Sequence, residues 1–237
     1  MTPILLYGVP AGSSMGLIAA LEWLGQPYRL CRVDMLTEMR EAAYAKLNAR
    51  HETPVLITDQ GRPLSETMAI ASWIEARDSE RKVSFEPCSP EADRMHQLMA
   101  FLNTGVTGAF GPLWTAMEMQ QPEPDYRNAL RRYGTASVVE RHEKLESIVG
   151  NGPYLVGDRP TLADAILIGV ARWLDFHEVA RPDRWPRSPG PRNGPRDWRC
   201  RRARHIGRFW LAHRQIAGAC HAVTCRSADR IKAEDQD

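Results

Sequence analysis

Short apolar runs alternate with segments of helical spacing through the first 78 residues. In the first helical segment, Leu17, Leu21 and Leu24 recur on one face and Gly25 ends the pattern. The pattern predicts strands over residues 3–7, 27–33, 54–58 and 62–64, and helices over residues 13–24, 38–47 and 66–77. This β-α-β-α-β-β-α order favours an α/β domain over residues 1–78, with helices covering a sheet.

The pattern changes at residues 79–90, which are polar, contain two prolines and are interpreted as a linker. Beyond them, helical spacing over residues 91–119, 124–149 and 162–178 predicts an all-α domain that covers residues 91–181. Thr161 and Asp164 form a capping box at the start of the last helix, so Asp164 is interpreted as structural. The run at 165–170 is apolar nearly all round, which predicts a buried central helix.

The composition is that of an ordinary globular protein, with 43% hydrophobic and 25% charged residues. No apolar run is long enough to span a membrane, and the N-terminus lacks the features of a signal peptide, so we expect a cytoplasmic protein. The five cysteines show no CxxC spacing, the seven histidines form no HExxH pair, and no glycine-rich phosphate loop occurs. These patterns argue against a disulfide framework, a metal site and a nucleotide site.

The net charge of +2 conceals a division between the two ends of the chain. Residues 181–237 hold 14 Lys+Arg and 6 Asp+Glu, which leaves 17 Lys+Arg and 23 Asp+Glu for residues 1–180. Residues 182–195 contain five prolines, and residues 181–208 contain ten arginines. We interpret residues 182–237 as an atypical tail, produced by a frameshift in the gene or partly disordered, in preference to an arm that binds nucleic acid or an acidic partner.

Several motifs, in this order, resemble the cytosolic glutathione S-transferase superfamily over residues 3–186. They are the β-α-β-α-β-β-α unit, Thr53-Pro54-Val55-Leu56 at the third strand, Glu66-Thr67 at the third helix, and Tyr154-Leu155-Val156-Gly157-Asp158 followed by Thr161-Leu162-Ala163-Asp164. Each motif is weak alone, and their shared order and spacing carry the resemblance. It implies that the first domain is thioredoxin-like, that the second is the family's helical domain, that glutathione is the co-substrate, and that the protein is a homodimer.

The resemblance also implies how the first domain would hold glutathione. Pro54 would be cis, and Thr53 would offer its N–H and C=O to the cysteinyl backbone of the ligand. Glu66 would meet the γ-glutamyl ammonium group, and Thr67 would hold the γ-glutamyl carboxylate at a helix N-terminus, which suits an anion. Considered apart from Thr53-Pro54, the residues Ser65-Glu66-Thr67 are interpreted as ordinary helix-capping residues.

Two further residues precede the expected cis-proline. By the same resemblance, His51 and Glu52 would approach the glycyl carboxylate end of glutathione. Taken alone, His51 is interpreted as a solvated loop residue.

A glutathione transferase needs the thiolate, because the thiol is a poor nucleophile. In the superfamily a Tyr, Ser or Cys near the start of the first helix donates a hydrogen bond to the sulfur, and here Ser13 is the first candidate and Ser14 the second. Both serines are also interpreted as N-cap residues, and Tyr7 is an alternative donor inside its strand. The chain resembles the bacterial beta class but lacks its cysteine, and has Thr107 and Gly108 in place of its His-Lys pair. Chemistry through a disulfide-linked cysteine is therefore not expected.

The electrophile pocket implied by the resemblance lies between the first loop and the first long helix. Its expected lining is Val9, Met99, Asn103, Val106 and Phe110, with Trp114 as a further candidate, although such a stripe is usually core. The predicted function is a glutathione transferase that acts on a small hydrophobic electrophile. The alternatives left open are a non-catalytic relative with an interaction or regulatory role, and a glutathione-dependent isomerase or dehalogenase.

Overall fold

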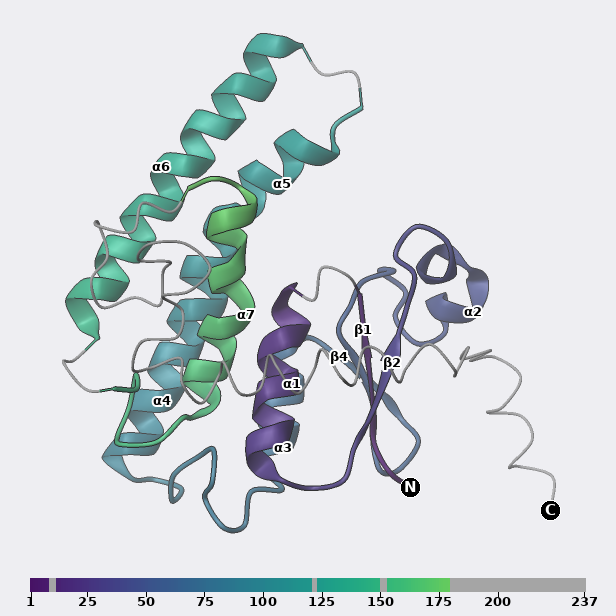
Figure 1. Cartoon of the computed structure of the whole chain (residues 1–237), viewed down its shortest axis with the longest axis vertical. Coiled ribbons are helices and arrows are strands. Elements are labelled where there is room, and N and C mark those ends of the chain that lie inside the picture. The colour runs from purple at the N-terminus through teal and green to yellow at the C-terminus, as the bar shows by residue number, and fades with distance from the viewer. Residues whose placement is uncertain (9–11, 121–122, 150–152, 180–237) are drawn as a thin grey trace.

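The computed structural model describes residues 1–8, 12–120, 123–149 and 153–179. Figure 1 shows a sheet with its helices beside a group of longer helices. The first unit contains the strands and helices predicted for the α/β domain, and the second contains only helices, as predicted for the all-α domain. The predicted fold class is therefore confirmed. The predicted tail, residues 182–237, lies outside the described residues.

A four-stranded mixed sheet forms the centre of the first domain. Its strands are β1 (Ile4–Tyr7), β2 (Arg29–Arg32), β3 (Val55–Ile57) and β4 (Pro63–Ser65), in the order β2-β1-β3-β4. β1 is parallel to β2 and antiparallel to β3, and β3 is antiparallel to β4. Because side chains alternate across a strand, Leu5 joins the main core with α1, while Leu6 packs with Tyr44 on the opposite face.

Three helices accompany the sheet: α1 (Gly12–Leu24), α2 (Ala42–Ala45) and α3 (Thr67–Glu75). Gly25 ends α1 as predicted, with a φ of +74°, and its N–H donates to the Leu21 carbonyl oxygen at 3.1 Å. The predicted helix over 38–47 is interrupted. A 3₁₀ turn at Glu38–Arg40 and the short α2 are separated by Glu41, whose backbone is extended.

The second domain contains α4 (Pro90–Ala100), α5 (Gly111–Glu118), α6 (Pro124–Ile148) and α7 (Leu162–Phe176). Residues 91–118 are helical, as predicted for 91–119, but the helix is not α-helical throughout, because a π-helical segment at Phe101–Thr107 and a 3₁₀ turn at Gly108–Phe110 lie between α4 and α5. Glycines at 105, 108 and 111 weaken the preference for an α-helix there, and the Thr107 hydroxyl donates to the Leu102 carbonyl oxygen at 2.9 Å.

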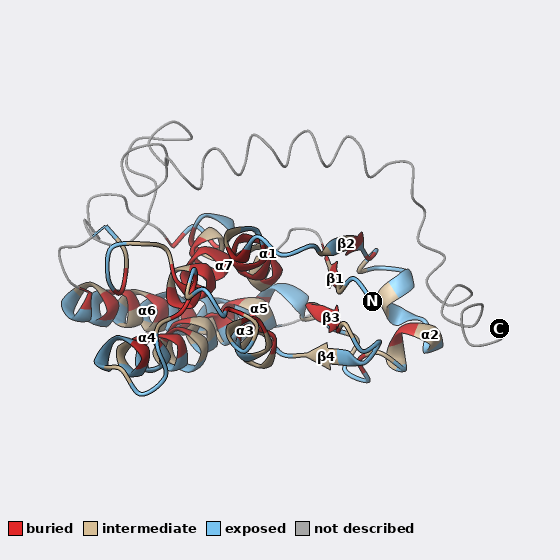
Figure 2. Cartoon of the chain, turned by 90° about the horizontal axis from the view of Figure 1, so that it is seen from below, coloured by how far each residue is buried: buried red, intermediate tan, exposed pale blue. Residues whose placement is uncertain are grey.

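The two domains meet where α1 packs against α7, and buried residues are concentrated on these helices in Figure 2. The contact is made by backbone, because a Cβ built on Gly16 would lie 2.0 Å from the Ala165 carbonyl oxygen. The predicted capping box starts α7: the Asp164 carboxylate accepts from the Thr161 N–H at 2.9 Å and from its hydroxyl at 2.8 Å. A further N–H, that of Leu155, donates to Asp164 at 2.9 Å.

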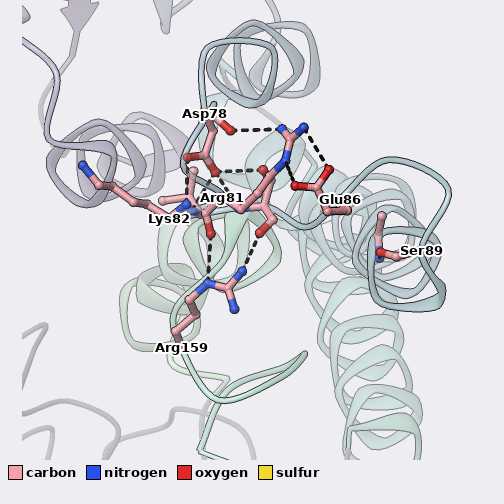
Figure 3. Close-up of polar contacts among 9 residues, drawn as sticks. Asp78, Arg81, Lys82, Glu86, Ser89 and Arg159 are labelled. Carbon is pink, nitrogen blue, oxygen red and sulfur yellow. Dashed lines mark hydrogen bonds and ion pairs between the residues drawn. The ribbon is translucent and has the colours of Figure 1, made fainter.

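The linker between the domains is organised around the buried carboxylate of Asp78, which is 1% exposed (Figure 3). This carboxylate accepts from the N–H groups of Lys82, Val83 and Ser84 and from the Ser84 hydroxyl, at 2.8 to 2.9 Å. Arg159, from the second domain, donates to the carbonyl oxygens of Arg81 at 3.0 Å and of Ser84 at 2.8 Å. The linker is therefore hydrogen-bonded to both domains.

Among the described helices, none combines the length and the apolar character that crossing a membrane requires.

Candidate functional site

A cavity of about 330 Å³ opens between the two domains. The first domain contributes side chains from the start of α1, the loop before β3 and the start of α3, and the second contributes side chains from the π-helical segment and α7. The lining residues are Ser13, Asn48, Arg50, Glu52, Thr53, Pro54, Glu66, Thr67, Asn103, Thr107, Ile166, Val170 and Trp173.

The loop before β3 presents a free peptide edge to this cavity. The Thr53–Pro54 bond is cis, as predicted. Within the described part of the chain, the N–H and C=O of Thr53 have no hydrogen-bond partner. Asn48 holds the loop instead, since its side-chain amide donates to the Glu52 carbonyl oxygen at 3.0 Å and accepts from the Arg50 N–H at 3.1 Å. The Thr53 peptide groups are thus available to a ligand.

The start of α3 presents charge and free donors. Glu66 occupies the N-cap position with a φ of +75°, but its side chain makes no capping hydrogen bond and pairs instead with Arg50. Arg50 also donates from Nε to Glu52 at 2.9 Å, and these hydrogen bonds to Glu52 and Glu66 raise the pKa of Arg50. The hydroxyl of Thr67, the first residue of α3, has no partner among the described residues. Glu66 therefore does not act as a simple side-chain cap.

The start of α1 separates the two candidate serines. Ser13 lines the cavity, and its hydroxyl makes no hydrogen bond within the described residues. Ser14 is only 2% exposed and does not line the cavity. The positive end of the α1 dipole lies at the start of this helix, beside Ser13, and favours an anion there. Of the two, Ser13 is the residue placed to meet a ligand.

The second domain supplies the more apolar wall. Ile166, Val170 and Trp173 fall on one face of α7, at spacings of four and three residues. Asn103 and Thr107 add an amide and a hydroxyl from the π-helical segment. This wall suits a ligand that is apolar but carries a polar group.

Most of the predicted glutathione-binding residues are brought together, but most of the predicted electrophile pocket is not. Met99, Val106 and Phe110 are at most 1% exposed and belong to the main core. His51 does not line the cavity, and its Nδ1 lies 2.6 Å from the Met39 carbonyl oxygen. Val9 lies outside the described residues. The predicted residues that line the cavity are Ser13, Glu52, Thr53, Pro54, Glu66, Thr67 and Asn103.

Five lining residues are not predicted from the sequence: Asn48, Arg50, Ile166, Val170 and Trp173. The three on α7 lie in or next to a segment that is apolar all round. In such a segment, the residues that line a cavity and the residues of the core show the same hydrophobic pattern. Arg50 lies in a polar loop, and its pairing with Glu66 joins residues 16 positions apart. Thr107 is identified from the sequence only as a difference from the beta-class His-Lys pair, and not as a residue that lines the cavity.

Family models match both parts of the chain. The model of the glutathione S-transferase N-terminal domain matches residues 14–77, and that of the glutathione S-transferase C-terminal domain matches residues 142–204. Together they cover α1 apart from its first two residues, Gly12 and Ser13, and also the loop before β3, the start of α3 and all of α7.

Individual relatives agree with these models. Glutathione S-transferase GstA of Escherichia coli is 23% identical over 170 residues, which is 71% of this chain and 81% of the relative. Maleylacetoacetate isomerase of Pseudomonas aeruginosa is 27% identical over 193 residues, which is 74% of this chain and 82% of the relative. A solved structure of a glutathione transferase homolog from Lodderomyces elongisporus, with two GSH per subunit, superimposes with a TM-score of 0.67 at 25% identity, covering 78% of this chain and 89% of the homolog.

Proposed function

The chain belongs to the glutathione S-transferase superfamily, and we propose that it binds glutathione in the cavity between its domains and activates the thiol for attack on a small hydrophobic electrophile. One observation carries the proposal. A single cavity collects the free peptide groups of Thr53, the start of α3 and the hydroxyl of Ser13.

Glutathione is a peptide with two carboxylates, an ammonium group and a thiol, and the first-domain wall offers a partner for the peptide and for its γ-glutamyl end. The N–H and C=O of Thr53 pair with the cysteinyl backbone as a neighbouring strand would. The Thr67 hydroxyl and the free N–H groups of α3 hold the γ-glutamyl carboxylate. The γ-glutamyl ammonium group pairs with the Glu66 carboxylate, in place of Arg50. The cysteinyl side chain then points toward the start of α1.

Ser13 carries the proposed chemistry. The thiol loses its proton to solvent water, and the hydroxyl of Ser13 donates a hydrogen bond to the resulting thiolate, which the α1 dipole also stabilises. The sulfur then forms a bond to the electrophilic carbon, and the leaving group departs with the bonding electrons. Ile166 and Val170 shield the apolar part of the electrophile from water, and Asn103 offers a hydrogen bond to a polar substituent.

Replacing Ser13 with alanine tests this assignment. We expect Ser13→Ala to raise the thiol pKa of bound glutathione by about one unit, because one donor to the thiolate is lost, and to lower the thiolate fraction about tenfold at a pH below the wild-type thiol pKa. Ultraviolet titration of the bound thiol measures the pKa. Ser147→Ala, on the exposed side of α6, is the matched control and should leave the pKa unchanged. An unchanged thiol pKa in Ser13→Ala would remove Ser13 from the mechanism.

A second candidate function is favoured by one observation, the 27% identity to maleylacetoacetate isomerase. A glutathione-dependent isomerase uses the same thiolate. The sulfur adds to a conjugated double bond, the carbon–carbon bond rotates, and expulsion of the thiolate restores the double bond. Consumption of glutathione separates the two functions, since a transferase consumes one glutathione for each product and an isomerase releases it unchanged.

A further inference from the structure

Trp173, which lines the cavity from the second domain, places an indole N–H beside the start of α1. We propose that this N–H is a second hydrogen-bond donor to the glutathione thiolate, beside the hydroxyl of Ser13. The inference rests on the proposed function and assigns to it a residue of the second domain.

The packing of α1 on α7 sets the position of the indole. The helices run antiparallel in this contact, so Gly16 faces Ala165, Ser13 faces Gly169, and Gly12 lies against Trp173. A Cβ built on Gly12 would be 3.3 Å from Nε1 of Trp173, and one built on Gly169 would be 3.0 Å from the Ser13 carbonyl oxygen. The nitrogen of the indole, rather than its far edge, is therefore the part that lies next to the first turn of α1.

The indole is also held in place by its neighbours. Its ring packs edge-on against Phe110 at 5.4 Å between centroids and against Trp114 at 5.2 Å. Phe110 is fully buried, so this side of the ring is anchored in the core. A ring fixed in this way can direct its N–H without losing further conformational entropy when a ligand binds.

The N–H itself is free to meet an anion. An indole nitrogen only donates, and within the described residues this one has no acceptor. Trp173 and Ser13 line the same cavity, so a sulfur placed at the start of α1 lies beside both. Hydrogen bonds to an ionised acceptor are stronger than those to its neutral form, so the N–H favours the thiolate over the thiol. The consequence is a lower thiol pKa without any further charged residue.

The test replaces Trp173 with phenylalanine, which keeps an aromatic ring in the packing and removes the N–H. We expect Trp173→Phe to raise the thiol pKa of bound glutathione by about half to one unit, so that the thiolate fraction falls about three- to tenfold at a pH below the wild-type thiol pKa. The dissociation constant for S-methylglutathione, which has no acidic thiol, should change less than about twofold. Trp114→Phe is the matched control, because it disturbs the same aromatic packing but leaves the Trp173 N–H in place.

The outcomes separate this inference from the proposed function. If Ser13→Ala raises the thiol pKa and Trp173→Phe does not, Trp173 is only a wall of the pocket. If the wild-type protein leaves the thiol pKa at the value of free glutathione, the proposed function fails and this inference with it. If Trp173→Phe does not fold, the indole N–H proton resonance of Trp173 in the wild type decides. A shift that follows titration of bound glutathione, and is missing with S-methylglutathione, supports the inference, and a resonance that does not respond overturns it.

Discussion

Replacing Gly16 with alanine is expected to lower the free energy of unfolding by about 3 kcal/mol, because the added methyl group has no room between α1 and α7. Its Cβ would lie 2.0 Å from the Ala165 carbonyl oxygen and 2.8 Å from the carbonyl carbon. Both are backbone atoms of a buried helix, so the two helices would have to move apart. Alanine normally stabilises a helix by up to about 1 kcal/mol relative to glycine, and the steric cost outweighs this gain.

Thermal unfolding followed by circular dichroism measures the effect, and the expected fall in Tm is about 6–12 °C. Gly108→Ala is the matched control. Its φ of −61° suits alanine and no atom lies within 4 Å of the new Cβ, so we expect equal or slightly higher stability. A Gly16→Ala protein as stable as the wild type would contradict the close approach of α1 and α7, and with it the placement of Trp173 beside the start of α1.

Replacing Asp78 with alanine is expected to cost a similar amount, about 3 kcal/mol, and to loosen the linker between the domains. The carboxylate is 1% exposed and accepts four hydrogen bonds, three of them from backbone N–H groups. Alanine leaves the N–H groups of Val83 and Ser84 without an acceptor, in a place where water does not replace it. Chemical denaturation measures the loss. Asp158→Ala, whose carboxylate is 94% exposed, is the control and should show no measurable loss.

The same carboxylate makes stability depend on pH. Burial raises the pKa of Asp78, but the hydrogen bonds from Val83, Ser84 and Lys82 lower it by more, so it lies below the ordinary 3.8. A pKa lowered by folding means that the ionised form stabilises the folded state. This contribution is complete above the ordinary pKa and is lost as the pH falls through the folded value. Asp78→Asn should therefore lose less stability than the wild type on acidification below about pH 4, and an equal loss would show that Asp78 does not titrate in this way.

The order of strands and helices in the first domain could be predicted from the sequence because its elements have clear local signals. Residues at 3–7 and 54–58 are apolar runs bounded by turn residues, and Gly25 ends α1 where the helical pattern stops. The capping box of Thr161 and Asp164 was equally local. The π-helical segment within the predicted 91–119 helix has no clear local signal, because glycines at 105 and 108 are tolerated in many helices.

The polar residues that the first domain contributes to the candidate site could be predicted from motifs, whereas the apolar residues on α7 could not. Thr53 and Glu66 can be identified from the sequence because each stands at the head of a strand or helix within a motif of the superfamily. Trp173 has no such signal, since an aromatic residue at helical spacing is usually core, and its position beside α1 depends on Gly16 and Gly169. The choice between Ser13 and Ser14 required the direction in which each side chain leaves α1, which depends on how the helix packs.

Glutathione binding by the wild-type protein, measured by calorimetry beside Thr67→Ala, tests the central claim most directly. Thr104→Ala, an exposed threonine outside the cavity, is the matched control. The account predicts that the wild type and Thr104→Ala bind glutathione equally well, and that Thr67→Ala binds about tenfold more weakly because the γ-glutamyl carboxylate loses a hydroxyl donor. A wild-type protein that does not bind glutathione, or a Thr67→Ala protein that binds as tightly as the wild type, would contradict it.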